Sequence, residues 1–316
     1  MKAMIIGGAG FIGSHLCDAL VDLQMDVVCI DDLSLGSKNN IAHLLDDDKI
    51  VFEQADVSNQ DITDSLFERY RPDIVYHLAA NSDIQASSVN PDIEYKNTYS
   101  TTFSVLQTMR KYNIKKLFFS STSAVYGDKR DIMLDENTPN LSPVSYYGAA
   151  KLGSEALISA YSYMNDMSCM IFRFPNVIGP RLTHGVIYDF VRKLNHDQEQ
   201  LEILGDGKQT KPYIYVSDLI DAIVTFTSDI PEGVTLYNIG VNGATSVDRI
   251  AEIICEEMDL SNVIFKYTGG ESGWKGDVPR FLYCLDKVHE AGWYAKYDSD
   301  DAVRMAVTSA IGKSSL

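Results

Sequence analysis

A glycine-rich turn between an apolar run and a helical pattern constrains the fold of this chain more than any other feature. Residues 2–6 (KAMII) form the apolar run, and Gly7-Gly8-Ala9-Gly10-Phe11-Ile12-Gly13 follows it directly. Residues 11–23 then repeat apolar side chains with the helical period of about 3.6 residues. A strand, a tight glycine turn and a helix in this order are typical of a dinucleotide-binding fold.

The same alternation continues through the first half of the chain. Short apolar or β-branched runs predict strands at residues 26–30, 50–54, 73–77, 116–120 and 168–172. Helical patterns cover residues 62–70, 91–112 and 146–165, and Pro91 suits a first helical turn. Alternation at this spacing predicts an α/β fold with a doubly wound parallel (Rossmann) sheet.

The pattern changes after Phe174, where turn signals such as Gly179-Pro180 and Gly205-Asp206-Gly207 become frequent. Residues 213–216 and 236–239 resemble strands that return to the first domain. We therefore expect an NAD-binding Rossmann domain at 1–174, with return segments near 212–240. A smaller α+β domain, mainly substrate-binding, is expected at 175–316.

Composition excludes several classes of protein. Lys and Arg number 27 against 44 Asp and Glu, so the net charge of −17 leaves no basic surface for nucleic acid. The sequence has neither an 18-residue apolar run nor a signal-peptide pattern. Five dispersed cysteines without a CxxC pair argue against a disulfide framework or a zinc site. We expect a cytoplasmic protein without a metal, nucleic-acid or membrane partner.

The glycine turn predicts where a dinucleotide binds. Glycines let the main chain approach a pyrophosphate, and the helix N-terminus supplies N–H donors. Asp31 ends the second strand, 18 residues after Gly13. A carboxylate there accepts both ribose hydroxyls and repels a 2′-phosphate, which favours NAD over NADP. Five positions that follow the third and fourth strands also fit a dinucleotide groove: Asp56, Val57, Leu78, Ala79 and Ala80.

A second group of residues predicts acid–base chemistry. Tyr147 and Lys151 are four residues apart on a predicted helix, so they share one face. Residues 120–127 (SSTSAVYG) follow the fifth strand, at the sheet edge where open α/β folds have their active sites. A free phenol has a pKa of about 10, and lowering it to about 7 takes about 4 kcal/mol. A nearby ammonium group and a positively charged nicotinamide ring favour the phenolate.

Together these motifs resemble the extended short-chain dehydrogenase/reductase family, and within it the NAD-dependent nucleotide-sugar epimerases and dehydratases. The shared segments are GGAGFIG, DDLS (31–34), HLAA (77–80), SSTSAVYG, YGAAK (147–151), RFPNVIGPR (173–181), GDGKQTKPYIYVSDL (205–219) and GDVPRF (276–281). The resemblance covers nearly the whole chain and is strongest to the UDP-glucose 4-epimerases of archaeal type.

The resemblance implies a cofactor site and a catalytic triad. Thr122, Tyr147 and Lys151 match the triad, with Thr122 where many relatives have Ser. The positions that match NAD-binding residues are Gly7, Gly10, Phe11, Ile12, Gly13, Asp31, Leu33, Ser34, Asp56, Val57, Leu78, Ala79, Ala80, Asn97, Tyr147, Lys151 and Phe174.

The resemblance also implies contacts with a UDP-sugar. Besides Thr122 and Tyr147, Asn176 matches the residue that meets the sugar diphosphate. Lys211 stands where the family has a phosphate-binding Arg, and Arg280 matches a second such Arg. Lys retains the charge of Arg but cannot form its bidentate hydrogen bonds.

The reaction that the resemblance implies is C4 epimerisation of a UDP-hexose (UDP-glucose or UDP-galactose), which belongs to galactose metabolism. Tyr147 would remove the O4 proton while C4 gives a hydride to NAD, and a transient 4-keto sugar would take it back on the other face. Dehydratases of the family have Asp-Glu after the Thr, and decarboxylases have a Glu before VYG. Here Ser123 and Ala124 follow Thr122, so no carboxyl group is supplied and these reactions are disfavoured.

Three alternatives stay open. The sugar can be glucose or galactose, an N-acetylhexosamine, or a glucuronate whose carboxylate would meet Arg181 and His184. A non-catalytic nucleotide-binding scaffold is opposed by the intact triad.

Relatives pair through two long helices, which match 92–112 and 146–165 here, so we also expect a homodimer.

Overall fold

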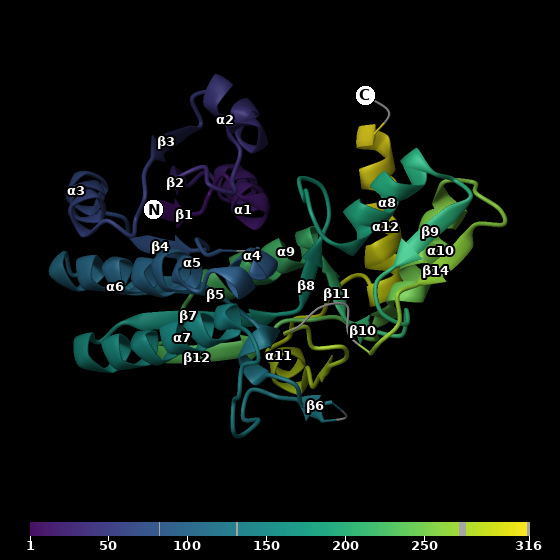
Figure 1. Cartoon of the computed structure of the whole chain (residues 1–316). Coiled ribbons are helices and arrows are strands. Elements are labelled where there is room, and N and C mark those ends of the chain that lie inside the picture. Colours follow the sequence, from purple (N-terminus) through teal and green to yellow (C-terminus); the bar gives the residue numbers. More distant parts are fainter. Residues whose placement is uncertain (82, 131, 272–275, 315–316) are drawn as a thin grey trace. The chain divides into compact units, whose positions relative to one another are not determined.

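The computed structural model describes residues 1–81, 83–130, 132–271 and 276–314, and it divides into two compact units (Figure 1). Unit 1 contains Met1–Val125, Ser145–Arg173 and Ile220–Tyr237. Unit 2 contains Tyr126–Val144, Phe174–Leu219 and Asn238–Leu316.

Unit 1 is built on a seven-stranded sheet with the order β12-β7-β5-β4-β1-β2-β3. The strands are β1 (Lys2–Ile6), β2 (Asp26–Asp31), β3 (Ile50–Gln54), β4 (Ile74–His77), β5 (Lys116–Thr122), β7 (Ser168–Phe174) and β12 (Gly233–Asn238). Neighbours from β3 to β5 pair in parallel, and Met4 of β1 lies between Val28 and Val75. The predicted doubly wound α/β fold is confirmed, and it brings the C-terminal ends of these strands to one edge.

Helices cover this sheet, and α3, α4 and α7 begin at a side-chain N-cap. The helices are α1 (Phe11–Asp22), α2 (Ala42–Asp46), α3 (Gln60–Tyr70), α4 (Ile84–Val89), α5 (Asp92–Glu94), α6 (Thr101–Lys111), α7 (Tyr146–Asn165) and most of α9 (Val216–Thr227), with short 3₁₀ turns at Lys38–Asn40 and Ser123–Tyr126. Ser145 caps α7 by accepting a hydrogen bond from the main-chain N–H of Gly148 at 3.1 Å. Helices α6 and α7 pack side by side (Figure 1).

The core of unit 1 lies between the sheet and these helices. It contains fully buried side chains from β1, β5, α6 and α7, including Met4, Phe119, Leu106 and Ile158. Each such side chain stabilises the fold by about 1.5–3 kcal/mol relative to an exposed one. This burial fixes α7 against the sheet.

The helix predicted at 91–112 contains a π-helix that the sequence pattern did not predict. Residues Tyr95–Ser100 form it, between α5 and α6. A π-turn inserts one extra residue into each hydrogen-bonded ring, which changes the faces that the flanking residues present. Such turns are frequent at functional sites.

The described residues of unit 2 form short strands and helices. Its strands are β6 (Met133–Leu134), β8 (Asn176–Ile178), β9 (Gln200–Ile203), β10 (Thr210–Lys211), β11 (Tyr213–Tyr215), β13 (Thr245–Ser246), β14 (Ile264–Tyr267) and β15 (Leu282–Tyr283). They form two-stranded sheets, parallel for β8-β11, β9-β14 and β6-β15 and antiparallel for β10-β13. The helices are α8 (Val186–His196), α10 (Val247–Glu257), α11 (Asp286–Glu290) and α12 (Ser299–Ser314).

The two units differ from the predicted boundaries in two places. Residues 126–144 lie in unit 2, because β6 pairs with β15 and Tyr126 donates a hydrogen bond to Asn238 at 2.7 Å. Within 212–240, Ile220–Tyr237 returns to unit 1, whereas β11 pairs with β8 in unit 2. Among the described residues, none of the helices has the length and apolar character needed to cross a membrane.

The glycine turn between β1 and α1 is required by close packing. Gly7 has φ = +85°, a conformation that favours glycine, and a Cβ there would lie 2.7 Å from the main-chain nitrogen of Ala79. A Cβ on Gly13 would lie 2.1 Å from the carbonyl oxygen of Gly7. The start of α1 can therefore lie against the turn only when both positions are glycine.

We predict that Gly13→Ala destabilises the protein by about 2 kcal/mol or more, because the new methyl group displaces the turn. Gly312→Ala in α12 is the matched control, since no atom of the described residues lies within 4 Å of a Cβ there. That change should be neutral or stabilise by up to about 1 kcal/mol. Urea unfolding measures all three proteins, and equal stability of Gly13→Ala and wild type would contradict the packing argument.

Candidate functional site

The predicted catalytic residues come together in unit 1. Thr122 ends β5, and Tyr147 and Lys151 lie one turn apart at the start of α7. Thr122 Oγ1 accepts a hydrogen bond from the N–H of Ala124 at 3.2 Å, and its own hydroxyl hydrogen-bonds Tyr147. Lys151 Nζ lies 6.0 Å from the centroid of the Tyr147 ring. The hydroxyl, the phenol and the ammonium group are therefore neighbours.

Lys151 is 1% exposed, although lysine is normally a surface residue. Its Nζ donates to the carbonyl oxygen of Ser120 at 2.6 Å and lies 4.6 Å from the centroid of the Phe119 ring. Burial lowers the pKa of Lys151 to about 7, against the opposing effect of the Glu94 and Glu155 carboxylates. Near neutral pH this lysine can therefore change its charge.

The phenol of Tyr147 responds to the same surroundings. Burial raises the pKa of Tyr147 above its usual value, the charge of Glu94 raises it further, and the hydrogen bond from Thr122 lowers it. In the protein alone the side chain is a neutral phenol at pH 7. It acts as a base at that pH only when additional positive charge lies next to it.

A buried ion pair links α7 to the sheet. Arg173 on β7 donates from Nε and Nη2 to the two oxygens of Glu155 at 3.0 and 2.6 Å, and Ser121 also donates to Glu155. All three side chains are buried. Because breaking such a pair leaves an uncompensated charge, it holds the face of α7 that carries Lys151 against β5 and β7.

The glycine turn and Asp31 fit an NAD molecule. Gly10 is the N-cap of α1 and has no side chain to cap the first-turn N–H groups, which suits a diphosphate. Asp31 is buried, and its two oxygens accept from the N–H groups of Ala9 and Leu33 at 2.9 and 2.8 Å. A carboxylate has about four acceptor positions, so capacity for ribose hydroxyls remains.

The other predicted cofactor residues lie mostly in unit 1. Phe11 and Ile12 begin α1, Val57 is buried after β3, and the N–H groups of Leu78 and Ala79 both donate to the carbonyl oxygen of Ile6. Two further positions have partners of their own. Asp56 forms an ion pair with Lys96 at 3.0 Å, and Ser34 hydrogen-bonds Asp32. Asn97 lies on the π-helix, Ala80 follows Ala79 after β4, and Phe174 ends β7 in unit 2.

Apart from Thr122 and Tyr147 in unit 1, the predicted sugar-nucleotide residues lie in unit 2. Asn176 on β8 is opposite Tyr213 on β11, and its side chain hydrogen-bonds the Tyr213 hydroxyl. Lys211 on β10 and Arg280 are brought close together, because Thr210 bridges to Arg280 and donates to the carbonyl oxygen of Pro279 at 2.8 Å. Arg280 is exposed.

Sequence reasoning missed two acidic residues at these sites. Asp277 forms an ion pair with Lys211, which offsets the charge that was predicted to bind phosphate. The sequence did contain a sign of Asp277, because this residue is part of the GDVPRF segment that resembles the family. Glu94 is buried and acts on both Tyr147 and Lys151 by its charge, but nothing in the sequence around it distinguishes it from a surface residue.

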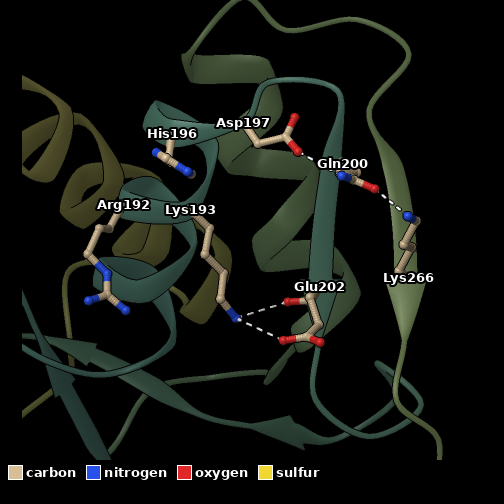
Figure 2. Close-up of a pocket in the computed structure, with 7 residues that line it drawn as sticks. All are labelled: Arg192, Lys193, His196, Asp197, Gln200, Glu202 and Lys266. Atoms are coloured by element: carbon tan, nitrogen blue, oxygen red, sulfur yellow. Dashed lines mark hydrogen bonds and ion pairs between the residues drawn. The ribbon is translucent and has the colours of Figure 1, made fainter.

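A hollow of about 600 Å³ lies elsewhere, on unit 2 between α8, β9 and β14 (Figure 2). It is lined by Arg192, Lys193, His196, Asp197, Gln200, Glu202 and Lys266. Figure 2 shows some of these residues paired with one another, for example Lys193 with Glu202 and Gln200 with Asp197. The predicted site residues are not among these seven, so the candidate site remains the cluster around Tyr147.

Comparison with known proteins identifies relatives of this chain over almost its full length. The chain is 32% identical over 309 residues to a Methanocaldococcus jannaschii protein provisionally named a UDP-glucose 4-epimerase, covering 96% of each chain. It is 30% identical to the UDP-glucose 4-epimerase of Azospirillum brasilense, covering 97% of this chain and 91% of that one.

Two solved structures have the same fold over almost their full length. The UDP-glucose 4-epimerase of Thermotoga maritima with UDP-glucose superposes with a TM-score of 0.89, 27% identity and full coverage of both chains. The UDP-glucuronic acid 4-epimerase of Bacillus cereus, with UDP-glucuronic acid and NAD, gives 0.87 at 26% identity, over 99% of this chain and 100% of that one. A family model matches residues 3–240, and the chain belongs to the NAD dependent epimerase/dehydratase family.

Proposed function

We propose that this enzyme catalyses the reversible C4 epimerisation of a UDP-hexose, interconverting UDP-glucose and UDP-galactose, with NAD as its bound cofactor. The observation that carries the proposal is the cluster of Thr122, Tyr147 and Lys151 at the C-terminal end of β5. Similarity to UDP-glucose 4-epimerases over the full chain supports the choice of sugar nucleotide.

In this proposal each residue of the cluster has a defined task. NAD supplies a reversible acceptor for the C4 hydrogen as hydride. Tyr147 accepts the O4 proton as a phenolate and returns it after the sugar has presented its other face. Thr122 holds the phenolic oxygen in place through its hydrogen bond. Lys151 contributes the positive charge that makes the phenolate accessible near neutral pH.

In this proposal the remaining predicted residues bind the cofactor or the substrate. The turn from Gly7 to Gly13 holds the NAD diphosphate on the N-terminus of α1, and Asp31 accepts the ribose hydroxyls. Asn176, Lys211 and Arg280 hold the UDP diphosphate. Because the chain carries a net charge of −17, few cations are available, and main-chain N–H groups must contribute to phosphate binding.

Dehydration and decarboxylation remain disfavoured. Ser123 and Ala124 form the first turn of the 3₁₀ segment after Thr122, and neither carries a carboxyl group. A second candidate is C4 epimerisation of UDP-glucuronate, which the similarity to the Bacillus cereus enzyme supports. His184 is exposed in unit 2, in the same loop as Arg181, where both were predicted to meet a carboxylate.

We also propose that the enzyme is a cytoplasmic homodimer that pairs through helices 92–112 and 146–165. All five cysteines are free thiols, which fits a reducing compartment. These helices expose large apolar side chains, among them Tyr95 and Phe103 on one and Tyr163 and Met164 on the other. Exposed apolar side chains gathered on neighbouring helices are typical of a protein interface.

The proposed reaction predicts products of unchanged mass. The purified protein is incubated with NAD and, separately, with UDP-glucose, UDP-galactose, UDP-N-acetylglucosamine and UDP-glucuronate, and products are resolved by chromatography with mass detection. UDP-glucose should give UDP-galactose, and the reverse. Tyr147→Phe should lower kcat by about 10²-fold or more, because the proton acceptor is lost while the fold is retained. A product lighter by water or carbon dioxide, or normal turnover by Tyr147→Phe, would contradict the proposal.

The proposed dimer predicts a change of mass on substitution. Phe103→Glu places a charge on α6 beside Tyr161 of α7 and should convert the dimer to a monomer. Tyr188→Glu is the control, since Tyr188 is similarly exposed (47% against 41%) but lies on α8 of unit 2. Light scattering after size exclusion gives the masses. A monomeric wild type, or a dimer that survives Phe103→Glu, argues against this interface.

A further inference from the structure

Glu94, the last residue of α5, is a buried carboxylate, and each of its two oxygens accepts a hydrogen bond. It is 1% exposed. Its Oε1 accepts from the side-chain amide of Asn81 at 2.8 Å, and its Oε2 accepts from the hydroxyl of Thr98 at 2.7 Å. The Thr98 hydroxyl in turn accepts from the main-chain N–H of Asn81 at 3.2 Å. Both donors are neutral, so these bonds fix the carboxylate without compensating its charge.

The elements around Glu94 pack directly on the helix that carries the catalytic pair. Helix α5 and the π-helix both contact α7. The contact is tight, because a Cβ on Gly153 of α7 would lie 3.0 Å from the ring of Tyr99. The π-helix begins immediately after Glu94. Glu94 is therefore held at a fixed place beside α7.

The charges near Glu94 and Lys151 come from five elements. Those nearby are His77 on β4, Lys96 on the π-helix, Tyr147 and Glu155 on α7, Arg173 on β7 and, at the start of α4, the exposed Asp83. Glu155 is bidentate with Arg173, and Lys96 pairs with Asp56. Burial lowers the pKa of His77 to about 3, so it is neutral at pH 7. Two buried carboxylates then act on Lys151: Glu155, whose charge is shared with Arg173, and Glu94, whose hydrogen-bond donors Asn81 and Thr98 are neutral.

We propose that Glu94 is a positioning residue of this enzyme: its buried charge keeps Lys151 in the ammonium form and thereby sets the pH range over which Tyr147 exchanges its proton. The inference rests on the proposed function of Tyr147 as the base. Glu94 touches neither substrate nor cofactor in this account. It acts through Lys151 and Tyr147.

The direction of the effect follows from the sign of the charge. The negative charge of Glu94 raises the pKa of Lys151, because it stabilises the ammonium ion. It also raises the pKa of Tyr147, because it disfavours the phenolate. Glu94 therefore places both the acid limb and the alkaline limb of the pH–activity profile at higher pH. Removing the charge should move the whole profile to lower pH.

Glu94→Gln keeps the shape of the side chain and removes its charge. In this variant the acid and alkaline limbs of the kcat profile should both shift to lower pH by about one unit, the order of magnitude expected when a nearby unit charge is removed in a medium with an effective dielectric constant of about 20. The KM for the UDP-sugar should change less than about twofold, because Glu94 contacts no ligand. An unshifted profile overturns the proposal.

Two control variants separate charge from structure. Thr98→Val removes one of the two hydrogen bonds to Glu94 but leaves its charge, and Glu94→Asp keeps the charge on a shorter side chain. If the charge is responsible, both controls retain the wild-type profile and Glu94→Gln alone shifts it. If Glu94 only holds the local fold, Thr98→Val shifts the profile as Glu94→Gln does, which overturns the proposal.

A titration without substrate distinguishes this inference from the proposed function. The absorbance of tyrosinate near 295 nm is followed with pH, and the Tyr147→Phe curve is subtracted from the wild type. The same difference is taken between Glu94→Gln and its double variant with Tyr147→Phe. The Tyr147 step should occur at lower pH without Glu94, whether or not any UDP-sugar is turned over. Identical steps overturn the proposal even in an active epimerase.

A stability cycle covers the case in which Glu94→Gln folds poorly. Lys151→Met alone and Glu94→Gln alone each leave one buried charge without its counterpart. The double variant removes both charges and should be more stable in urea than the sum of the single effects. If Glu94→Gln does not fold, recovery of folding in the double variant supports the proposal. Additive effects, or a double variant that also fails to fold, overturn it.

Discussion

The burial of the Lys151 ammonium group at the C-terminal end of β5 is the constraint on which the rest of the candidate site depends. Its Nζ is held by the carbonyl oxygen of Ser120 and lies against the Phe119 ring, so the sheet and not only α7 fixes its position. A buried ammonium group is stable only with hydrogen-bond acceptors and a compensating charge. The buried carboxylates of Glu94 and Glu155 meet that need, and Arg173 is present because Glu155 itself requires a partner.

In the proposed cofactor site of unit 1, main-chain groups would take the place of side-chain cations. The positive end of the α1 dipole favours a diphosphate, and the Asp31 carboxylate a few ångströms away favours hydroxyl groups. Asp31 also accepts from the N–H of Ala9, so the same carboxylate fixes the conformation of the glycine turn. A chain with a net charge of −17 can bind an anionic ligand here, because the local field opposes its overall charge.

Local patterns predicted the strands of the sheet and the glycine turn, and they gathered the candidate catalytic residues, whose roles stay a prediction. The third strand and the helix with Tyr147 were placed with the boundaries that the structure has, because apolar periodicity and a Ser145 cap determine them locally. The pairing of β6 with β15 joins residues about 150 positions apart, and no local pattern reports such a contact. Glu94 was missed for the same reason, because its burial depends on Asn81, Thr98 and α7. From sequence alone, a glutamate before a polar helix is expected to be exposed.

The charge balance of unit 2 decides which of the predicted phosphate ligands is stronger. Lys211 is mostly buried and pairs with Asp277. A diphosphate that binds Lys211 would either displace the Asp277 carboxylate or lie next to it, so that two anions would be close together. Arg280 is exposed on the neighbouring segment and presents a planar guanidinium that can bind two oxygens of one phosphate. In the proposed substrate site Arg280 would therefore supply the bidentate contact with the diphosphate that a lysine at position 211 cannot make, and Lys211 would add its charge in exchange for its contact with Asp277.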